Sequence, residues 1–211
     1  KNLRALAKNA KSKKIWFSSK TPYSAGMTVA KILRISTKIV QKALKTFKGL
    51  TGRLEFVKEK NGVKYYNDTT ATTPDATIYA LHQLGKTCPE RLVLSGVEGS
   101  RKIILIAGGV DKKLDYKNLA KEIAKSAKAL ILFKGSASDK ILRELKSFKF
   151  DTSRFIIVKN IASMKQAVKL AENLASKGNI IVLSPASASF NIFKNEFDRG
   201  DQFNRFVKRL K

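Results

Sequence analysis

Three short segments of the sequence gather side chains of the kinds that bind anions. The first, from Asn67 to Pro74, holds four threonines and an aspartate. The second, 107–115, has paired glycines followed by two lysines, and the third, 184–200, has three serines near its start. Hydroxyl and ammonium groups donate hydrogen bonds to phosphate and carboxylate oxygens, and glycine lets the backbone approach a ligand closely. These segments therefore predict a site for an anionic ligand.

Each segment also has a purely structural explanation. Asp68 could accept hydrogen bonds from a ribose or hold a cation, and the neighbouring hydroxyls could bind oxygens at the N-terminus of the next helix. Alternatively, Thr72 or Thr73 before Pro74 forms a good helix start by itself. Capping needs one hydroxyl and four are present, so we favour ligand binding for this segment.

The other two segments are less specific. A Gly108-Gly109 pair occurs in many tight turns, although the lysine that follows closely supplies a point charge for an anion. The serines of 184–189 could cap a helix or bind a carboxylate. No histidine accompanies these serines, so none of them is expected to be a nucleophile.

Strands alternating with helices would place these segments at one edge of a sheet. An Asn61-Gly62 turn predicts a hairpin, and runs such as Ile103–Ala107 are continuously apolar, as buried parallel strands are. The pattern predicts an α/β fold with a doubly wound, mostly parallel, Rossmann-like sheet, whose ligands bind beyond the carboxyl ends of the strands. The expected strands are 53–57, 63–67, 102–107, 129–133, 155–158 and 180–183, and the expected helices are 73–84, 116–127, 138–147, 161–176 and 193–210.

The first 50 residues follow a different pattern. We expect a short helix over 2–10, a short strand over 14–17 and two helices within 25–47, where apolar residues recur at helical spacing. Gly49 and Gly52 then indicate a boundary, so the sheet domain is expected to follow a short helical segment.

Composition excludes several classes of protein. One cysteine cannot form an internal disulfide, one histidine argues against a His/Cys metal cage, and no apolar run approaches the roughly 18 residues that cross a bilayer. These features predict a cytoplasmic protein without membrane association.

The chain is strongly basic: 43 Lys and Arg against 16 Asp and Glu give a net charge of +27, and Glu55 is the first acidic residue. A basic module that binds nucleotides or nucleic acid is therefore the alternative function, although no basic run interleaves with aromatics as base stacking requires.

Three motifs occur in order, each after a predicted strand: NDTTAT, GG-x-DK-x-LD and SPASASFNIFKNEFDRG. Together they resemble the carboxyl-terminal domain of the Mur ligase family, and specifically of the members that add D-glutamate to UDP-N-acetylmuramoyl-L-alanine during peptidoglycan precursor synthesis. The segment Gly49–Glu55 resembles that family's hinge. The resemblance identifies 1–50 as an incomplete remnant of the central ATPase domain and 51–211 as the glutamate-binding domain.

The resemblance implies an ATP-dependent ligase that activates a carboxylate as an acyl phosphate, which the amine of D-glutamate then attacks. It assigns Arg53 and Asp68 to ATP, with Asp68 at the ribose. It assigns the D-glutamate carboxylates to Thr72, Lys112, Ser189 and Phe190, the last through its backbone. Lys112 is also the catalytic candidate, because a dianionic amino acid needs a nearby cation. Asn67 and Thr69 would support these residues.

The sequence also departs from the family. A threonine, Thr70, stands where many relatives carry lysine, and 88–101 looks like extra sequence. The 211 residues contain no G-x-x-G-K-[ST] phosphate loop, and no metal ligands are assigned, since those for Mg²⁺ are expected in the central domain. We therefore expect a truncated chain with little or no ligase activity alone, and a monomer for the complete protein.

Overall fold

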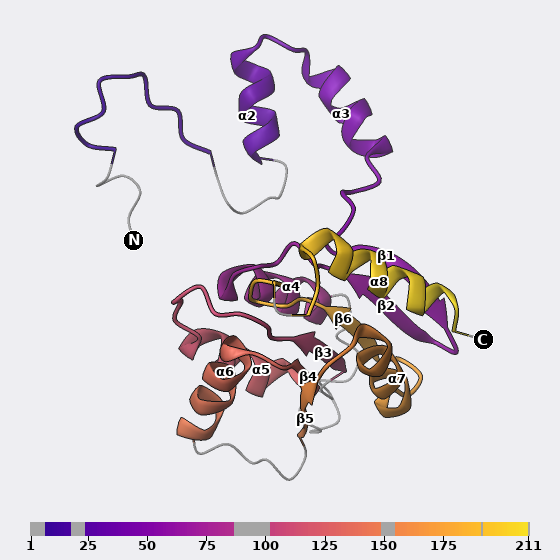
Figure 1. The fold of residues 1–211 in the computed structure, drawn as a ribbon. Coiled ribbons are helices and arrows are strands. Elements are labelled where there is room, and N and C mark those ends of the chain that lie inside the picture. Colours follow the sequence, from indigo (N-terminus) through magenta and orange to yellow (C-terminus); the bar gives the residue numbers. More distant parts are fainter. Residues whose placement is uncertain (1–6, 18–23, 87–101, 149–154, 191, 211) are drawn as a thin grey trace, which may run out of the picture. The chain divides into compact units, whose positions relative to one another are not determined.

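The chain forms two compact units, Lys1–Lys48 and Gly49–Lys211. The computed structural model describes residues 7–17, 24–86, 102–148, 155–190 and 192–210 (Figure 1). The first unit contains helices α2 (Ser24–Ile32) and α3 (Thr37–Thr46). The strand expected over 14–17 is wrong, since these residues form no strand and the sheet of the described residues does not include them. Of the helix expected over 2–10, residues 7–9 form a turn, and 2–6, like the whole 88–101 stretch, lie outside the described residues.

The second unit is built on a six-stranded sheet with strand order β1-β2-β6-β3-β4-β5. β1 and β2 pair antiparallel, and every other neighbouring pair is parallel. This arrangement confirms the predicted α/β class with a mostly parallel sheet. The strands are β1 (Glu55–Lys60), β2 (Val63–Asn67), β3 (Ile103–Ala107), β4 (Ala127–Phe133), β5 (Ile156–Ile161) and β6 (Ile180–Leu183).

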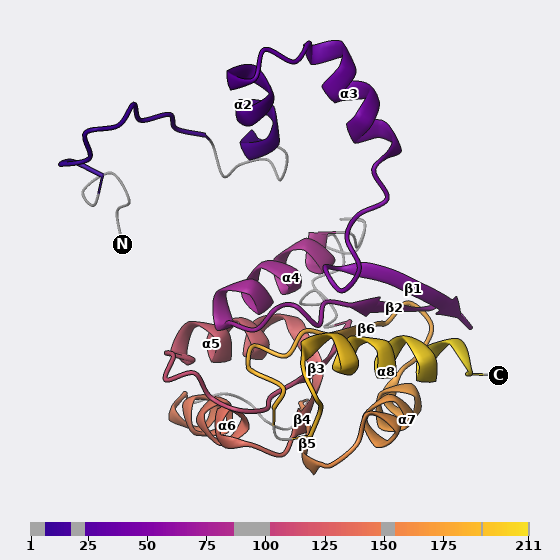
Figure 2. The same ribbon diagram turned by 45° about the horizontal axis from the view of Figure 1, so that its top comes forward.

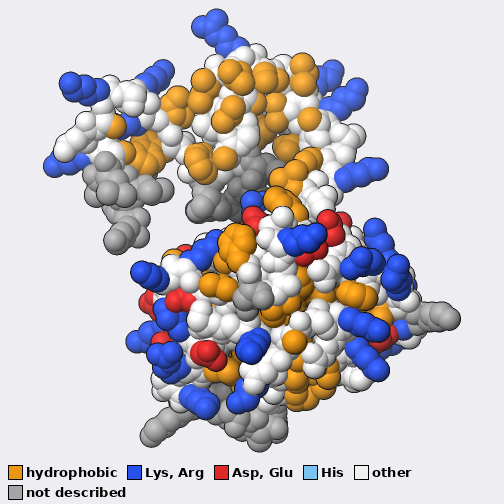
Figure 3. All heavy atoms as spheres, viewed as in Figure 1, with side chains coloured by type: hydrophobic (Ala, Val, Ile, Leu, Met, Phe, Trp, Pro, Cys, Tyr) orange, Lys and Arg blue, Asp and Glu red, His pale blue; other side chains and the backbone are white. Residues whose placement is uncertain are grey.

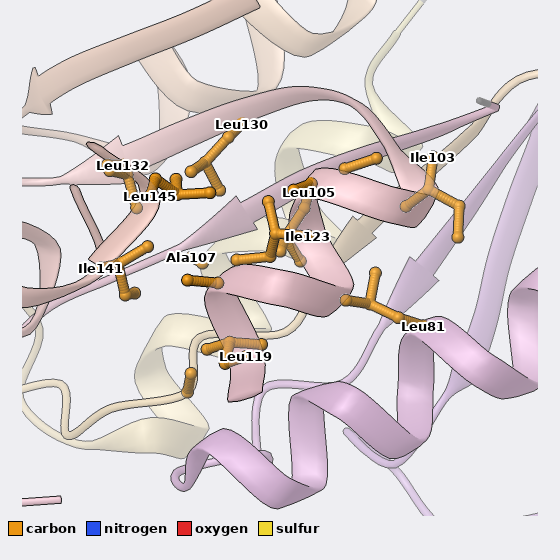
Figure 4. Packing of buried hydrophobic residues seen from close by; sticks show 14 of the residues in the cluster. Leu81, Ile103, Leu105, Ala107, Leu119, Ile123, Leu130, Leu132, Ile141 and Leu145 are labelled. Atoms are coloured by element: carbon orange, nitrogen blue, oxygen red, sulfur yellow. The ribbon is translucent and has the colours of Figure 1, made fainter. Parts of the chain in front are cut away.

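Helices cover both faces of this sheet, as Figures 1 and 2 show. On one face lie α4 (Pro74–Lys86), α5 (Lys117–Ser126) and α6 (Ser136–Ser147), and on the other lie α7 (Met164–Leu174) and α8 (Glu196–Lys208). Alternate residues of the central strands enter the two layers: Leu105 packs with the first group of helices, and Ile104 and Ile106 pack with the second. In the first layer, leucines and isoleucines of the helices project onto β3 and β4 (Figure 4), among them Leu81, Leu119, Ile123, Ile141 and Leu145.

Two predicted helix starts are wrong for the same physical reason. Ile161 ends β5 by pairing with Phe133, and α7 begins only at Met164, after Ser163 accepts a 3.2 Å hydrogen bond from the Gln166 amide. Likewise α8 begins at Glu196 rather than 193, because the Asn195 side chain accepts a 2.9 Å hydrogen bond from the amide of Asp198. Polar caps, rather than the apolar pattern, set these helix starts.

The first unit exposes much apolar surface. Large hydrophobic side chains at least 43% exposed occur throughout it, and orange side chains gather over α2 and α3 in Figure 3. Its described part buries one hydrophobic residue, Ala30. The exposed residues are Ile15, Trp16, Phe17, Val29, Ile32, Leu33, Ile35, Ile39 and Phe47.

Candidate functional site

The three polar segments meet at the carboxyl ends of β2, β6 and β3, which are adjacent in the sheet. We call them the β2 loop (67–73), the β3 loop (108–116) and the β6 loop (184–195). An antiparallel bridge joins Val110 of the β3 loop to Ala188 of the β6 loop, with N–O distances of 3.0 and 3.1 Å. The Ala186 amide donates to the Ala71 carbonyl at 2.8 Å, which ties the β6 loop to the β2 loop. The β6 loop therefore lies between the other two and fixes both.

Gly109 allows the close approach of the β3 and β6 loops. Its φ of +141° lies in a region that L side chains rarely adopt. A Cβ there would lie 2.8 Å from the Ser187 hydroxyl and collide with the carbonyl of Ala188. The paired glycines of the sequence thus serve loop packing at this position.

Lys112 and Thr72 come together from two different loops. The Lys112 ammonium donates a 3.0 Å hydrogen bond to the Thr72 hydroxyl, and the lysine is exposed to solvent. An ammonium and a hydroxyl at this separation can both donate to one carboxylate. The two residues were predicted to share a ligand, and the structure places them side by side.

Ser189 lies immediately after the bridge that links its loop to the loop of Lys112. The residue is 2% exposed, and its hydroxyl has no hydrogen-bond partner among the described residues. Buried hydroxyls are nearly always hydrogen-bonded, so an unpaired one at a loop junction is suited to a ligand oxygen. The next residue, Phe190, has a 69% exposed side chain.

Asp68 lies at the end of β2 and is 7% exposed. Its carboxylate accepts hydrogen bonds from the Leu54 amide at 3.1 Å and from the Ser184 hydroxyl at 2.7 Å. Burial raises the pKa of this carboxyl from 3.8 to about 6, although those two hydrogen bonds and the nearby charge of Arg53 oppose the shift. Arg53 itself is exposed. The charge of Arg53 thus reaches Asp68, its predicted partner in contacting a nucleotide, and the Asp68 oxygens retain lone pairs for a further donor.

Thr70 has a structural role. Its hydroxyl donates to the carbonyl of Gly52 at 2.8 Å, and its amide donates to the same oxygen at 3.1 Å. Thr70 therefore fixes the segment before β1 to the β2 loop.

Sequence reasoning missed Arg199, which lies on α8 and is fully buried. Its guanidinium donates to the hydroxyl and carbonyl of Thr69 at 3.1 and 2.8 Å and to the Ser187 carbonyl at 3.3 Å. Burial lowers its pKa to about 10, with the charge of Glu196 opposing the shift. The signal in the sequence is the arginine of the FDRG motif, a residue to which the motif alone assigns no role.

Asp111 was also not assigned a role. It forms a 2.6 Å ion pair with Lys140 of α6, and its other oxygen accepts from the Leu114 amide at 3.2 Å. Although desolvation opposes the change, hydrogen bonds from Lys140, Leu114 and Tyr116 and the charge of Lys140 lower its pKa. These contacts hold the β3 loop one residue before Lys112.

The part of the chain that the structure describes contains neither a candidate metal site nor a candidate membrane-spanning helix. No group of three or more His, Cys, Asp or Glu side chains there could hold a metal ion. No described helix is both long and apolar enough to cross a membrane.

Comparison with known proteins identifies similar chains. The family model described as "Mur ligase, glutamate ligase domain" matches residues 52–187. The chain is 42% identical over 182 residues to the UDP-N-acetylmuramoylalanine–D-glutamate ligase of Borreliella afzelii, covering 86% of this chain and 36% of that protein. It is 37% identical over 185 residues to the enzyme of that name from Acetivibrio thermocellus, covering 87% and 36%. The chain thus spans about a third of the length of these relatives.

A solved domain from a Haemophilus ducreyi ligase, named for UDP-N-acetylmuramate and a diaminopimelate-containing peptide, also matches. Its sequence is 14% identical and its TM-score is 0.43, over 64% of this chain and 89% of that domain.

Proposed function

Because the chain belongs to the Mur ligase family, we propose that residues 51–211 are the glutamate-binding domain of a ligase that adds D-glutamate to UDP-N-acetylmuramoyl-L-alanine. The names of its relatives support this substrate pair. The observation that carries the proposal is the 3.0 Å contact between Lys112 and Thr72, which brings a cation and a hydroxyl from separate loops to one point. Residues 1–50 would then be a remnant of the central ATPase domain.

In this proposal the domain binds and orients D-glutamate. Lys112 neutralises one carboxylate and shares it with the Thr72 hydroxyl. The second carboxylate accepts from Ser189, whose buried hydroxyl has no other partner among the described residues, and from the backbone at Phe190. Catalysis by such a domain lies in holding the amine in position for attack rather than in a protein nucleophile.

ATP would be contacted from this side by Arg53 and Asp68. The guanidinium of an exposed arginine is suited to a phosphate, and a carboxylate with free lone pairs is suited to a ribose hydroxyl. When bound, ATP supplies the phosphoryl group that activates the substrate carboxylate. We assign no Mg²⁺ ligand among the described residues, and the family's Mg²⁺ site is expected in its central domain. Cytoplasmic localisation, and a monomer for the complete protein, belong to the same proposal.

Calorimetric titration of the purified chain with D-glutamate tests the site, with L-glutamate as the stereochemical control. Lys112→Met should weaken D-glutamate binding by about ten- to a hundredfold, since hydrogen bonds to charged groups contribute about 1.5–3 kcal/mol. Lys113→Met is the matched control, because this neighbouring lysine is also exposed and loses the same charge. Equal effects of the two substitutions would show that only general charge matters, and the proposal would fail.

The same purified chain should form no amide when given ATP, D-glutamate and UDP-N-acetylmuramoyl-L-alanine. Its 211 residues contain no phosphate-loop motif to cradle the triphosphate. Product detected by mass spectrometry would contradict this expectation.

A further inference from the structure

Arg199 differs from an ordinary buried arginine because its guanidinium forms no ion pair with a described residue, although the charge of Glu196 acts on it from farther away. No carboxylate of the described residues lies within ion-pair distance of the guanidinium. Its three hydrogen bonds go to neutral acceptors, two carbonyls and one hydroxyl. Burying a charge costs free energy that an apolar side chain of similar size would not incur. A cation kept under these conditions points to a role besides packing.

The acceptors lie on two different loops of the candidate site. Thr69 is in the β2 loop, three residues before Thr72, and Ser187 is in the β6 loop, two residues before Ser189. The planar guanidinium has donors in a fixed geometry, so it sets the separation of the two loops as a flexible ammonium cannot. Gly200, the next residue, permits this approach, since a Cβ there would lie 2.5 Å from Thr69 Cγ2.

We propose that Arg199 is the positioning residue that holds the β2 and β6 loops in register, so that Thr72 and Ser189 reach the same anionic ligand. The inference rests on the proposed function for the identity of that ligand, D-glutamate. Arg199 is not a catalytic residue, because it is fully buried, donates to Thr69 and Ser187, and acts through the loops that carry the binding groups.

Two readouts on the full 211-residue chain test this role. Amide hydrogen exchange at Ala186 and Ala188 reports whether the loops are joined, since these amides donate to Ala71 and Val110 of the neighbouring loops. Calorimetry reports the affinity for D-glutamate. The Arg199→Lys variant keeps the positive charge but loses the planar guanidinium with its fixed donors. In this variant, hydrogen exchange at both amides should be at least tenfold faster and D-glutamate binding at least tenfold weaker.

Val207→Ala is the matched control, since Val207 is fully buried on the same helix but belongs to the apolar packing of α8. It should lower stability while leaving loop exchange and affinity near the wild-type values. If Arg199→Lys does not fold, Thr69→Val removes one acceptor at nearly equal volume and should shift both readouts in the same direction, by about threefold.

Wild-type exchange in Arg199→Lys would overturn the proposal, and so would faster exchange with unchanged D-glutamate affinity. Equal losses in Val207→Ala would reduce the effect to general destabilisation and overturn it as well. If the wild-type chain binds no D-glutamate, the proposed function fails separately. The exchange comparison then still decides whether Arg199 holds the two loops together.

Discussion

Replacing Asp68 with asparagine should make the protein more stable at neutral pH. The carboxyl is buried, and its pKa is raised from 3.8 to about 6, chiefly by desolvation. The folded protein therefore binds this proton more tightly than the unfolded chain does. The contribution of the protonated Asp68 carboxyl to the unfolding free energy is fully present below about pH 4 and is lost as the pH rises through about 6.

The size of the effect follows from the shift in pKa. At 1.36 kcal/mol per pKa unit, raising the value from 3.8 to about 6 amounts to about 3 kcal/mol at pH 7. Asparagine has nearly the same shape as aspartate and carries no charge, so it removes the free-energy cost of burying the ionised carboxylate. Its oxygen can accept from the Leu54 amide, and its NH₂ group can donate to Ser184, whose hydroxyl can then donate to Thr77 at 3.0 Å. No buried group in this chain of contacts needs to lose its partner.

Urea unfolding of the wild type and of Asp68→Asn, measured between pH 4 and pH 8, gives the difference in unfolding free energy. Asp111 and Asp198, whose pKa values are lowered, titrate equally in both proteins and cancel in the difference. The two proteins should agree within about 1 kcal/mol near pH 4, and the variant should be more stable by about 3 kcal/mol at pH 7. A difference in unfolding free energy that stays flat with pH, or a variant that becomes less stable than the wild type as the pH rises, would contradict this account.

Three further outcomes are expected. Gly109→Ala should lower the unfolding free energy by about 2 kcal/mol or more and weaken D-glutamate binding, because the added methyl group collides with the β6 loop. The control is Gly85→Ala, whose methyl group meets no atom within 4 Å; thermal melting should show this variant to be as stable as the wild type or slightly more stable. Sedimentation velocity should show concentration-dependent association, reduced by Ile39→Lys, because the first unit exposes large apolar side chains; one sharp, concentration-independent monomer would contradict this. Any binding to a DNA oligonucleotide should fall steeply between 50 and 200 mM salt and survive Lys112→Met, whereas D-glutamate binding should be weakened in that variant; DNA binding that survives the substitution in a chain that binds no D-glutamate would favour the nucleic-acid alternative.

The fold could be predicted because burial leaves a recognisable pattern of apolar residues in the sequence. Runs such as Ile103–Ala107 and Ile180–Leu183 are apolar at every position, since both faces of a parallel sheet are covered by helices. Since the carboxyl ends of neighbouring parallel strands share one sheet edge, the sequence alone predicts that Thr72, Lys112 and Ser189 lie in one region. The strand at 14–17 could not be excluded in this way, because an apolar run does not reveal whether a partner strand exists.

The contacts that join the loops could not be predicted, since each depends on residues far apart in the sequence. Arg199 binds Thr69, 130 positions earlier, and Asp68 accepts a hydrogen bond from Ser184, 116 positions later. An arginine on a helix is normally solvated, and nothing local to the FDRG motif distinguishes a buried one. Only the approach of α8 to the end of β2 determines which acceptors it meets.

Asp68 and Arg199 together indicate what this sheet edge is built for. Both are buried charges of opposite sign at the end of the same strand, yet neither neutralises the other: Asp68 accepts from Leu54 and Ser184, and Arg199 donates to Thr69 and Ser187. Each desolvated charge therefore opposes folding and is held by neutral groups on separate loops. A fold selected for stability alone would replace both with apolar side chains. Their presence is explained if the positions of the β2 and β6 loops matter more to this protein than the stability lost, which is the condition that a site assembled from those loops requires.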